Sequence, residues 1–298
     1  MSKIFRKDIF VFIIGIALVC YPIISNFVAS KNNAGLISTY DKQVDNLSSA
    51  EKKEMIKDAE QWNDKLYRQQ KGISVDDNLD YLDILNIGNG IIGSIEIPQI
   101  DVNLPIYHGT NDDVLNIGTG HVEDSSMPVG GINTHTVITG HSGLPSNKLF
   151  TRLDELKEKD IFYICVLDEI LAYEIDTIET VLPENADYQI EDGKDLATLV
   201  TCTPYGINTH RLLVTGHRIQ YDQGVKDTIR KSLPSSHELI IYRCNAPLPP
   251  RCRPLPLPRN VIDYPVMGGN VSRPCNIPTA PNASGCPSPV LGCSNNSL

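Results

Sequence analysis

The sequence predicts a mostly β protein: a closed eight-stranded β-barrel with short helices, preceded by an N-terminal helix and a transmembrane anchor. Three observations carry this prediction. They are an uncharged run over residues 9–30, a capped helical pattern over 49–70, and seven or eight strand-like segments within 91–221. So many short strands in about 130 residues, separated by turn residues, are typical of a closed or nearly closed barrel.

The uncharged run predicts the membrane anchor. Lys3, Arg6 and Lys7 precede it, and a helix over 9–30 at about 1.5 Å per residue spans roughly 30 Å, the thickness of a bilayer core. The basic side chains keep residues 1–8 in the cytoplasm and leave the rest of the chain outside. An uncleaved anchor is the favoured interpretation; a cleaved signal peptide and a buried core helix are the alternatives.

Residues 31–90 contain the N-terminal helix. Ser48 and Glu51 have the spacing of a capping box, in which each side chain bonds the other residue's backbone. Apolar residues then recur at spacings of four, three and four: Met55, Ala59, Trp62 and Leu66. This pattern predicts a helix over 49–70 that stops near Gly72, followed by an acidic, loop-like stretch over 73–90.

Beyond residue 90 the pattern takes the period of a strand. Segments rich in Ile, Val, Leu, Thr and Tyr, bounded by Gly, Pro, Asn or Asp, occupy 91–97, 102–107, 136–141, 160–167, 170–181, 196–202 and 210–219. Asp168 and Glu169 have the character of a two-residue hairpin turn. Short helices are expected near 111–117, 146–155 and 223–232.

Composition limits the possible functions. The 298 residues carry 26 Lys and Arg against 36 Asp and Glu, a net charge of −10, so a nucleic-acid partner is not expected. The charge is uneven, because residues 245–298 carry +3 and residues 1–244 carry −13. With 41% apolar and 21% charged residues, the first part can build a hydrophobic core.

The tail over 222–298 is atypical. Its last 54 residues hold 12 of the 20 prolines, and five of the eight cysteines lie at Cys244 or beyond. This composition predicts no packed core, and we expect the tail to be disordered. Three interpretations stay open: an extended polyproline stalk, a disulfide-linked segment, and sequence that departs from the native reading frame near 222–245.

Three side chains in the strand region fit nucleophilic acyl transfer. His141 and Cys202 end strand-like segments, and Arg211 begins one, with eight residues between Cys202 and Arg211. A thiolate can attack a carbonyl carbon, an imidazole can move the proton, and a guanidinium can stabilise the oxyanion. The alternatives are a buried structural cysteine and a solvated arginine. The spacing of the other histidines indicates no metal site, and no Gly-x-Ser-x-Gly motif marks Ser142 as a nucleophile.

Several motifs resemble those of one family. The block 198–206, with Asn208 to Leu212, resembles the active-site signature of sortases, and 139–145 resembles their catalytic-histidine loop. The segments 93–98, 104–109 and 118–131 resemble the barrel strands that precede that loop. The set is similar to class C, the pilus-assembling sortases of Gram-positive bacteria, and it covers 91–221 densely and 1–90 loosely.

The resemblance implies a cysteine transpeptidase that cleaves an LPxTG-like sorting motif and holds a thioester. It makes Cys202 the nucleophile, His141 the acid–base partner and Arg211 the transition-state stabiliser, and it leaves His121 structural. Ser142, Thr201 and Tyr205 flank these positions and are expected to bind substrate. No cofactor or metal is implied.

The implied partners are pilin or surface proteins that carry the sorting motif. The acceptor is a lysine amine of another pilin in class C and a cell-wall precursor amine in other classes. A wall-anchoring sortase and a non-enzymatic extracellular barrel with a buried Cys202 are therefore the alternative functions.

The sequence departs from class C in two places. Residues 71–90 lack the Asp-Pro of the family's N-terminal lid, although Asp77 or Asp80 with Tyr81 could replace it. We expect this segment to cover the cleft partly. Residues 222–244 are too charged for a second transmembrane helix.

Overall fold

The computed structural model describes residues 2–75, 79–144 and 147–224. The chain divides into two units, Met1–His237 and Glu238–Leu298, and every described residue belongs to the first. The expected disordered tail, the helix near 223–232 and the question of a second span therefore lie largely or wholly outside the described residues.

The anchor run forms part of a longer helix, α1 (Ser2–Asp45), which continues well beyond residue 30. Its large apolar side chains from Ile9 to Val28 are exposed, and its length and composition are those of a membrane-crossing helix; within the described ranges it is the one such helix. Its last turns dock on the barrel. The Tyr40 hydroxyl donates to Ile92 O at 3.1 Å and accepts from Leu167 N at 3.0 Å. Tyr40 and Val44 pack with Ile91 and Tyr107.

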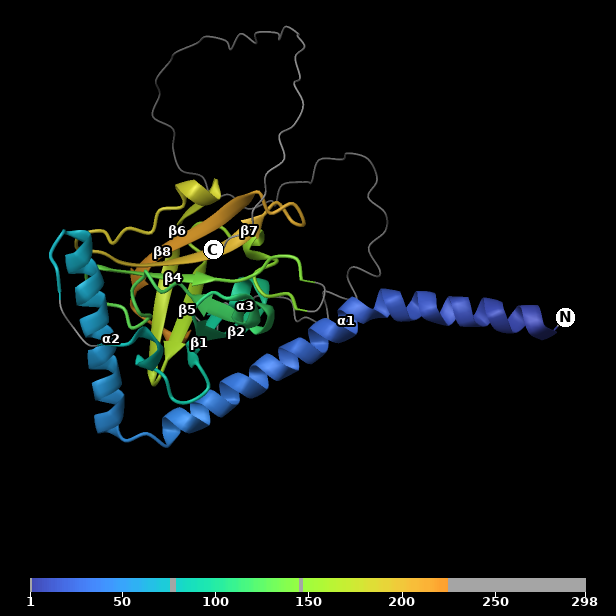
Figure 1. Cartoon of the computed structure of the whole chain (residues 1–298), viewed down its shortest axis with the longest axis horizontal. Coiled ribbons are helices and arrows are strands. Elements are labelled where there is room, and N and C mark those ends of the chain that lie inside the picture. Colours follow the sequence, from blue (N-terminus) through green and yellow to red (C-terminus); the bar gives the residue numbers. More distant parts are fainter. Residues whose placement is uncertain (1, 76–78, 145–146, 225–298) are drawn as a thin grey trace, which may run out of the picture. The chain divides into compact units, whose positions relative to one another are not determined.

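The capping box sets the start of α2 (Ser49–Gln70), as the sequence predicts. Ser48 N donates to Glu51 Oε2 at 2.8 Å, and Glu51 N donates to Ser48 Oγ at 3.2 Å. The helix lies along the barrel in Figure 1 and buries Ala59 and Trp62 in its core. Gly72, with φ of 76°, ends it at the predicted position.

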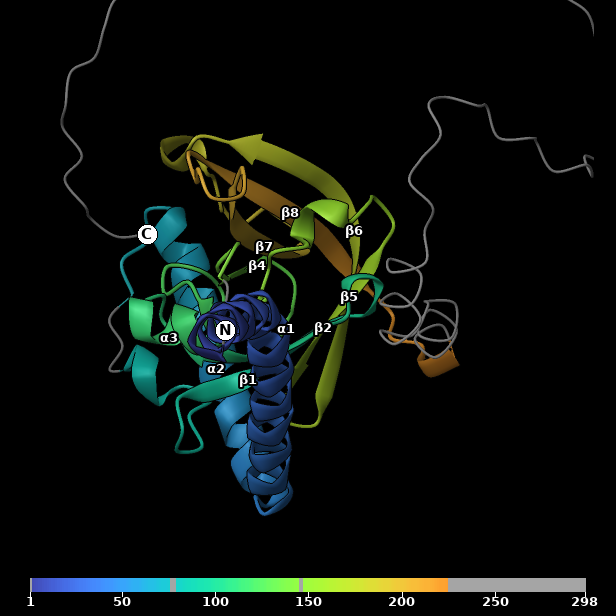
Figure 2. The ribbon, with the colours of Figure 1, turned by 90° about the vertical axis from the view of Figure 1, so that its right-hand side faces the viewer.

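Eight strands close into a barrel, which confirms the predicted fold class (Figures 1 and 2). Around the barrel their order is β1-β2-β3-β4-β7-β8-β6-β5. The strands are β1 (Ile91–Ile97), β2 (Val102–His108), β3 (Thr119–His121), β4 (Thr134–Thr139), β5 (Ile161–Val166), β6 (Glu169–Val181), β7 (Asp195–Thr203) and β8 (His210–Ile219). Neighbours are antiparallel except for β2 with β3 and β4 with β7.

Four short helical pieces join the strands, besides the turn η1 (Tyr81–Asp83) before β1. They are η2 (Pro98–Ile100), α3 (Asp112–Ile117), η3 (Leu153–Glu155) and η4 (Pro183–Asn185). α3 matches the prediction for 111–117, and Asn111 caps it by accepting from Val114 N at 3.0 Å. The longer helix expected over 146–155 is wrong, because only η3 forms there among the described residues.

The β5–β6 turn lies one residue before its predicted place. Val166 pairs with Glu169, so Leu167 and Asp168 form the two-residue connection. Leu167 adopts the left-handed φ of 49°, and its N–H donates to the Tyr40 hydroxyl. This long-range bond to α1 holds a conformation that an isolated leucine disfavours.

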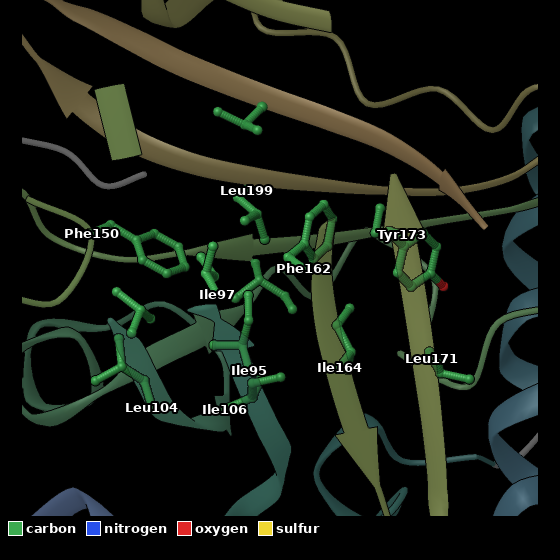
Figure 3. Packing of buried hydrophobic residues seen from close by; sticks show 14 of the residues in the cluster. Ile95, Ile97, Leu104, Ile106, Phe150, Phe162, Ile164, Leu171, Tyr173 and Leu199 are labelled. Carbon is green, nitrogen blue, oxygen red and sulfur yellow. The ribbon is translucent and has the colours of Figure 1, made fainter. Parts of the chain in front are cut away.

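Aliphatic and aromatic side chains from the strands and from the loop that contains Phe150 fill the interior of the barrel. Figure 3 shows the following residues converging: Ile95, Ile97, Leu104, Ile106, Phe150, Phe162, Ile164, Leu171, Tyr173 and Leu199. Phe162 and Tyr173 stack with ring centroids 5.4 Å apart. Each fully buried large side chain contributes about 1.5–3 kcal/mol relative to an exposed one, so this cluster dominates the stability of the fold.

Aromatic side chains from α2 and η1 pack against the barrel. Trp62 and His108 both lie against the Tyr81 ring, with centroids 5.7 and 5.0 Å from it. The Tyr81 hydroxyl lies 3.0 Å from His121 Nδ1, and His108 Nε2 lies 2.8 Å from Ile84 O. Because β2 ends at His108, the described residues 79–90 pack where β2 ends.

The expected cover over the cleft by residues 71–90 stays a prediction. β4 and β7 run toward Cys202, whereas β2 runs the other way along the barrel, since β1 pairs with it antiparallel and the β1–β5–β6–β8 ladder fixes the directions. Through the β2–β3–β4–β7 register, His108 lies level with Leu199, three residues before Cys202 on β7, and the buried Tyr81 ring packs against the His108 ring. Residues 76–78, including Asp77, lie outside the described residues.

Candidate active site

The nucleophile candidate and the arginine face each other on neighbouring strands. Cys202 on β7 is the direct partner of Arg211 on β8 in the antiparallel register. Side chains of directly opposed residues point to the same face of a sheet, with Cβ atoms about 4.5–5.5 Å apart. The thiol and the guanidinium are thus brought together as the sequence predicts, and Cys202 is a half-buried free cysteine.

His141 lies on the other side of β7. β4 runs parallel to β7, with Thr139 opposite Val200, so the chain after Thr139 passes the end of β7. Gly140 N donates to Val200 O at 3.1 Å, which continues the pairing by one residue. His141 follows at once and is half-buried. The three predicted side chains therefore come from three adjacent strand ends.

The face that carries Cys202 is not the core face. Along β7, Leu199 belongs to the main core, whereas Val200 belongs to a separate buried cluster with Val137 and Leu213. Since successive side chains alternate, Cys202 shares the outer face with Val200, and Arg211 shares it with Leu213. An apolar floor thus leads along β4, β7 and β8 to the thiol.

The loop between β6 and β7 borders this apolar surface, although no sequence pattern marked it as part of the site. Ala186 and Tyr188, in the connection between β6 and β7, pack against the outer cluster. Burial raises the pKa of Tyr188, and the positive charge of Arg211 opposes that rise, so the phenol lies within electrostatic reach of the guanidinium. No periodic pattern marks this segment, because it is a loop between strands.

The guanidinium of Arg211 is held by backbone carbonyl oxygens. Its Nη1 donates to two carbonyl oxygens of its own loop, Asn208 O at 3.4 Å and His210 O at 3.3 Å. Among the described residues no carboxylate forms an ion pair with it. A guanidinium fixed by carbonyls, with further N–H groups unused by them, can donate to an oxyanion or a substrate carbonyl.

The three expected substrate-binding residues have different surroundings. Ser142 is half-buried beside His141. Tyr205 is 66% exposed, and its ring lies over Gly143, where an added Cβ would meet the ring carbon Cε2 at 2.9 Å. Both therefore lie at the histidine loop.

Thr201 differs from that expectation. It is 4% exposed, faces the core side of β7, and its hydroxyl donates to Gly140 O at 2.7 Å. The expectation that Thr201 contacts substrate is wrong, because strand alternation turns it away from the face of Cys202.

His121 has the buried structural surroundings that the sequence analysis expects. Its Nε2 lies 2.9 Å from Ser126 O, which can only accept, so Nε2 carries the hydrogen and Nδ1 accepts from the Tyr81 hydroxyl. Complete burial lowers its pKa to about 4, so it is neutral at pH 7. In the described part of the chain, no group of three or more His, Cys, Asp or Glu residues could hold a metal ion.

The closed barrel carries a thiol, a guanidinium and an imidazole on adjacent strand ends. This combination is typical of cysteine enzymes that transfer acyl groups. The Sortase domain family model matches residues 95–219. Sortase C1 of Streptococcus agalactiae is 43% identical, with a TM-score of 0.59, and the match covers 63% of this chain and 99% of that chain. Clostridium perfringens sortase C, solved with the C-terminal cell wall sorting motif, is 43% identical, with a TM-score of 0.57 and coverages of 63% and 100%.

Sortase A of Streptococcus agalactiae serotype III is 35% identical over 118 residues, which are 38% of this chain and 47% of that protein. The match thus spans about half the length of this curated relative. The chain belongs to the sortase family.

Proposed function

We propose that this sortase cleaves an LPxTG-like sorting motif and joins the acyl group to a lysine amine of a pilin, thereby polymerising pili. The observation that carries the proposal is the direct pairing of Cys202 with Arg211, with Gly140, the residue before His141, bonded to Val200 of β7. Family membership supplies the reaction class, and the similarity to class C structures over 63% of the chain favours the pilus role.

The chemistry follows in two steps. Cys202 Sγ attacks the carbonyl carbon of the motif's Thr, and the Thr–Gly bond breaks as His141 gives a proton to the leaving Gly amine. The acyl group is then held as a thioester. An acceptor amine attacks that thioester, His141 takes a proton from the amine, and the thiolate leaves as an isopeptide bond forms. Arg211 stabilises the oxyanion in both steps.

The outer apolar cluster supports a peptide substrate. Val137, Val200 and Leu213 provide a hydrophobic floor on the face of Cys202, and Tyr188 walls it beside Arg211. The Leu and Pro side chains of a sorting motif can bury apolar area on such a floor while the scissile carbonyl reaches the thiol.

α1 supports a location in the membrane. Its exposed apolar residues would be covered by lipid, and one such helix within the described ranges favours a membrane-anchored protein with its barrel outside the cell. Substrates and acceptors at the outer membrane surface are pilins or other surface proteins, and cell-wall precursors.

Wall anchoring is the second candidate, because Sortase A of Streptococcus agalactiae matches 38% of this chain at 35% identity. It shares the first step and differs only in the acceptor, a cell-wall precursor amine. The active-site residues themselves do not discriminate between the two acceptors.

The test is cleavage of a fluorogenic LPxTG-type peptide by wild type, Cys202→Ala and the control Cys165→Ala, a second half-buried thiol on β5. We expect loss of cleavage only in Cys202→Ala. Full cleavage by that variant would leave the barrel as a non-enzymatic scaffold. Incubation with a pilin and with a cell-wall precursor, followed by mass spectrometry of the linked product, identifies the acceptor.

A further inference from the structure

The hydroxyl of Thr201 links the nucleophile strand to the histidine loop. It donates to Gly140 O at 2.7 Å, and Thr201 and Gly140 immediately precede Cys202 and His141 in the chain. The bond therefore joins the residue before the nucleophile to the residue before the imidazole. Thr201 is buried and faces the core, so it cannot touch a substrate on the outer face.

The rest of the histidine loop is fixed around this bond. Gly140 N donates to Val200 O at 3.1 Å, so both backbone polar groups of Gly140 are held by β7. On the other side, Phe150 N donates to His141 O at 3.1 Å. A Cβ on Gly140 would meet Phe150 Cδ2 at 2.9 Å, so the backbone already lies as close to that ring as it can.

Among these contacts, the bond from the Thr201 hydroxyl is the one made by a side chain. It reaches Gly140, one residue beyond the end of β4. β4 ends at Thr139, so the β4–β7 ladder has no further strand pair to hold Gly140 O. Without the hydroxyl, that buried carbonyl would lose its partner and would shift toward one elsewhere. The imidazole would move with it.

We propose that Thr201 is a positioning residue that sets the separation between His141 and Cys202. The inference rests on the proposed roles of those two residues. Proton transfer needs donor and acceptor within hydrogen-bond reach, and a displacement of about 1 Å can lower a rate by about 10²-fold. Thr201 thus acts on the chemical step and leaves the substrate-binding floor unchanged.

The test compares three variants by steady-state cleavage of the sorting peptide. Thr201→Val keeps the shape and removes the hydroxyl, and we expect kcat to fall at least 10-fold with KM within about 2-fold of wild type. Thr201→Ser keeps the hydroxyl and should restore kcat to within about 2-fold of wild type. An unchanged kcat in Thr201→Val, or equal losses in the Ser and Val variants, would overturn the proposal.

Thr198→Val is the matched control on the same strand. Its hydroxyl is also buried and lies 2.7 Å from His135 Nε2 and 2.8 Å from Thr215 Oγ1, away from the histidine loop. We expect a lower Tm with kcat unchanged. A kcat loss equal to that of Thr201→Val would show that any buried threonine of β7 matters, and the proposal would fail.

A second readout separates this proposal from the proposed function. The rate of Cys202 alkylation by iodoacetamide is measured against pH by peptide mass spectrometry, and it needs no substrate. The histidine loop lies beside the thiol, so a displaced His141 should make the profile of Thr201→Val differ from that of wild type. An unmoved profile contradicts the positioning role, whatever the cleavage assay gives. If Thr201→Val fails to fold, Thr201→Ala is measured in the same way.

Discussion

Asn63 and Met127 exchange two hydrogen bonds, as paired strand residues do. Met127 N donates to Asn63 Oδ1 at 2.6 Å, and Asn63 Nδ2 donates to Met127 O at 3.2 Å. Both residues are buried, and 64 residues separate them in the chain. The side chain of one helix residue thus completes the backbone bonding of the loop between β3 and β4, and fastens α2 to the barrel.

Asn63→Ala should therefore destabilise the protein by about 1–3 kcal/mol, because it leaves the buried N–H of Met127 without its partner, whereas Met127 O keeps Val129 N at 2.8 Å and Thr136 Oγ1 at 3.3 Å. The neighbouring Asp64→Ala is the control. Asp64 is exposed and pairs with Arg68 across one helical turn, a contact that contributes roughly 0.2–0.5 kcal/mol. Urea unfolding of the detergent-solubilised proteins measures both, and equal losses would contradict the assignment.

His121 should make stability depend on pH. Burial lowers its folded pKa to about 4, below the 6.5 of the unfolded chain, so the unfolded state binds more protons between these values. The contribution of neutral, buried His121 to the free energy of unfolding is fully present above pH 6.5. It falls by about 3 kcal/mol as the pH drops toward 4. Burial also lowers the pKa of His108 and His135, which adds to the same slope.

In His121→Gln the pH slope of urea stability between pH 4 and 6.5 should flatten, because glutamine can still donate to Ser126 O but does not titrate. His217→Gln is the control, since His217 is exposed beside Asp176. A slope unchanged from wild type in His121→Gln would show that other groups cause the acid sensitivity.

Tyr40→Phe should loosen the end of α1 from the barrel. The Tyr40 hydroxyl accepts from Leu167 N and donates to Ile92 O, and the side chain is 3% exposed. Its removal should cost about 1–3 kcal/mol. Tyr67→Phe removes an exposed hydroxyl that bonds Asp192 and should change stability by less than about 0.5 kcal/mol. Denaturant midpoints that do not distinguish the two variants would refute the docking role of Tyr40.

Tyr205→Ala tests whether the exposed ring over Gly143 binds substrate. Loss of an apolar contact of this size should raise KM for the sorting peptide roughly 10-fold with little change in kcat, whereas Tyr205→Phe should behave as wild type. Ile207→Ala, at a side chain 67% exposed in the same loop, gives the background effect. A Tyr205→Ala variant with an unchanged KM would remove Tyr205 from the substrate site.

The periodic parts of the fold could be predicted from the sequence. The bounds of α2, β1 and β8 match the sequence patterns, because alternation or a capped helical face extends through each of them. β3 gave no signal, because three residues are too few to show a period. The turn at Leu167 shifted because a distant tyrosine holds it.

The candidate site, like the fold, could be predicted in part from the sequence. Motif resemblance placed Cys202, His141 and Arg211 together, and strand alternation alone could have shown that Thr201 faces the core if Cys202 faces outward. The contact of Thr201 with Gly140 and the wall formed by Tyr188 depend on which strands become neighbours. That information lies in the packing of the barrel and not in local spacing.

The parallel pairing of β4 with β7 has a consequence for folding. Thr139 and Val200 are neighbours in the barrel but 61 positions apart in the chain, and the segments that form β5 and β6 lie between them in the sequence. Contacts of such long sequence separation carry a loop-closure entropy and form late or slowly. A newly made chain therefore has no imidazole beside its thiol until the barrel has closed, and His141 and Cys202 come together only in the folded protein.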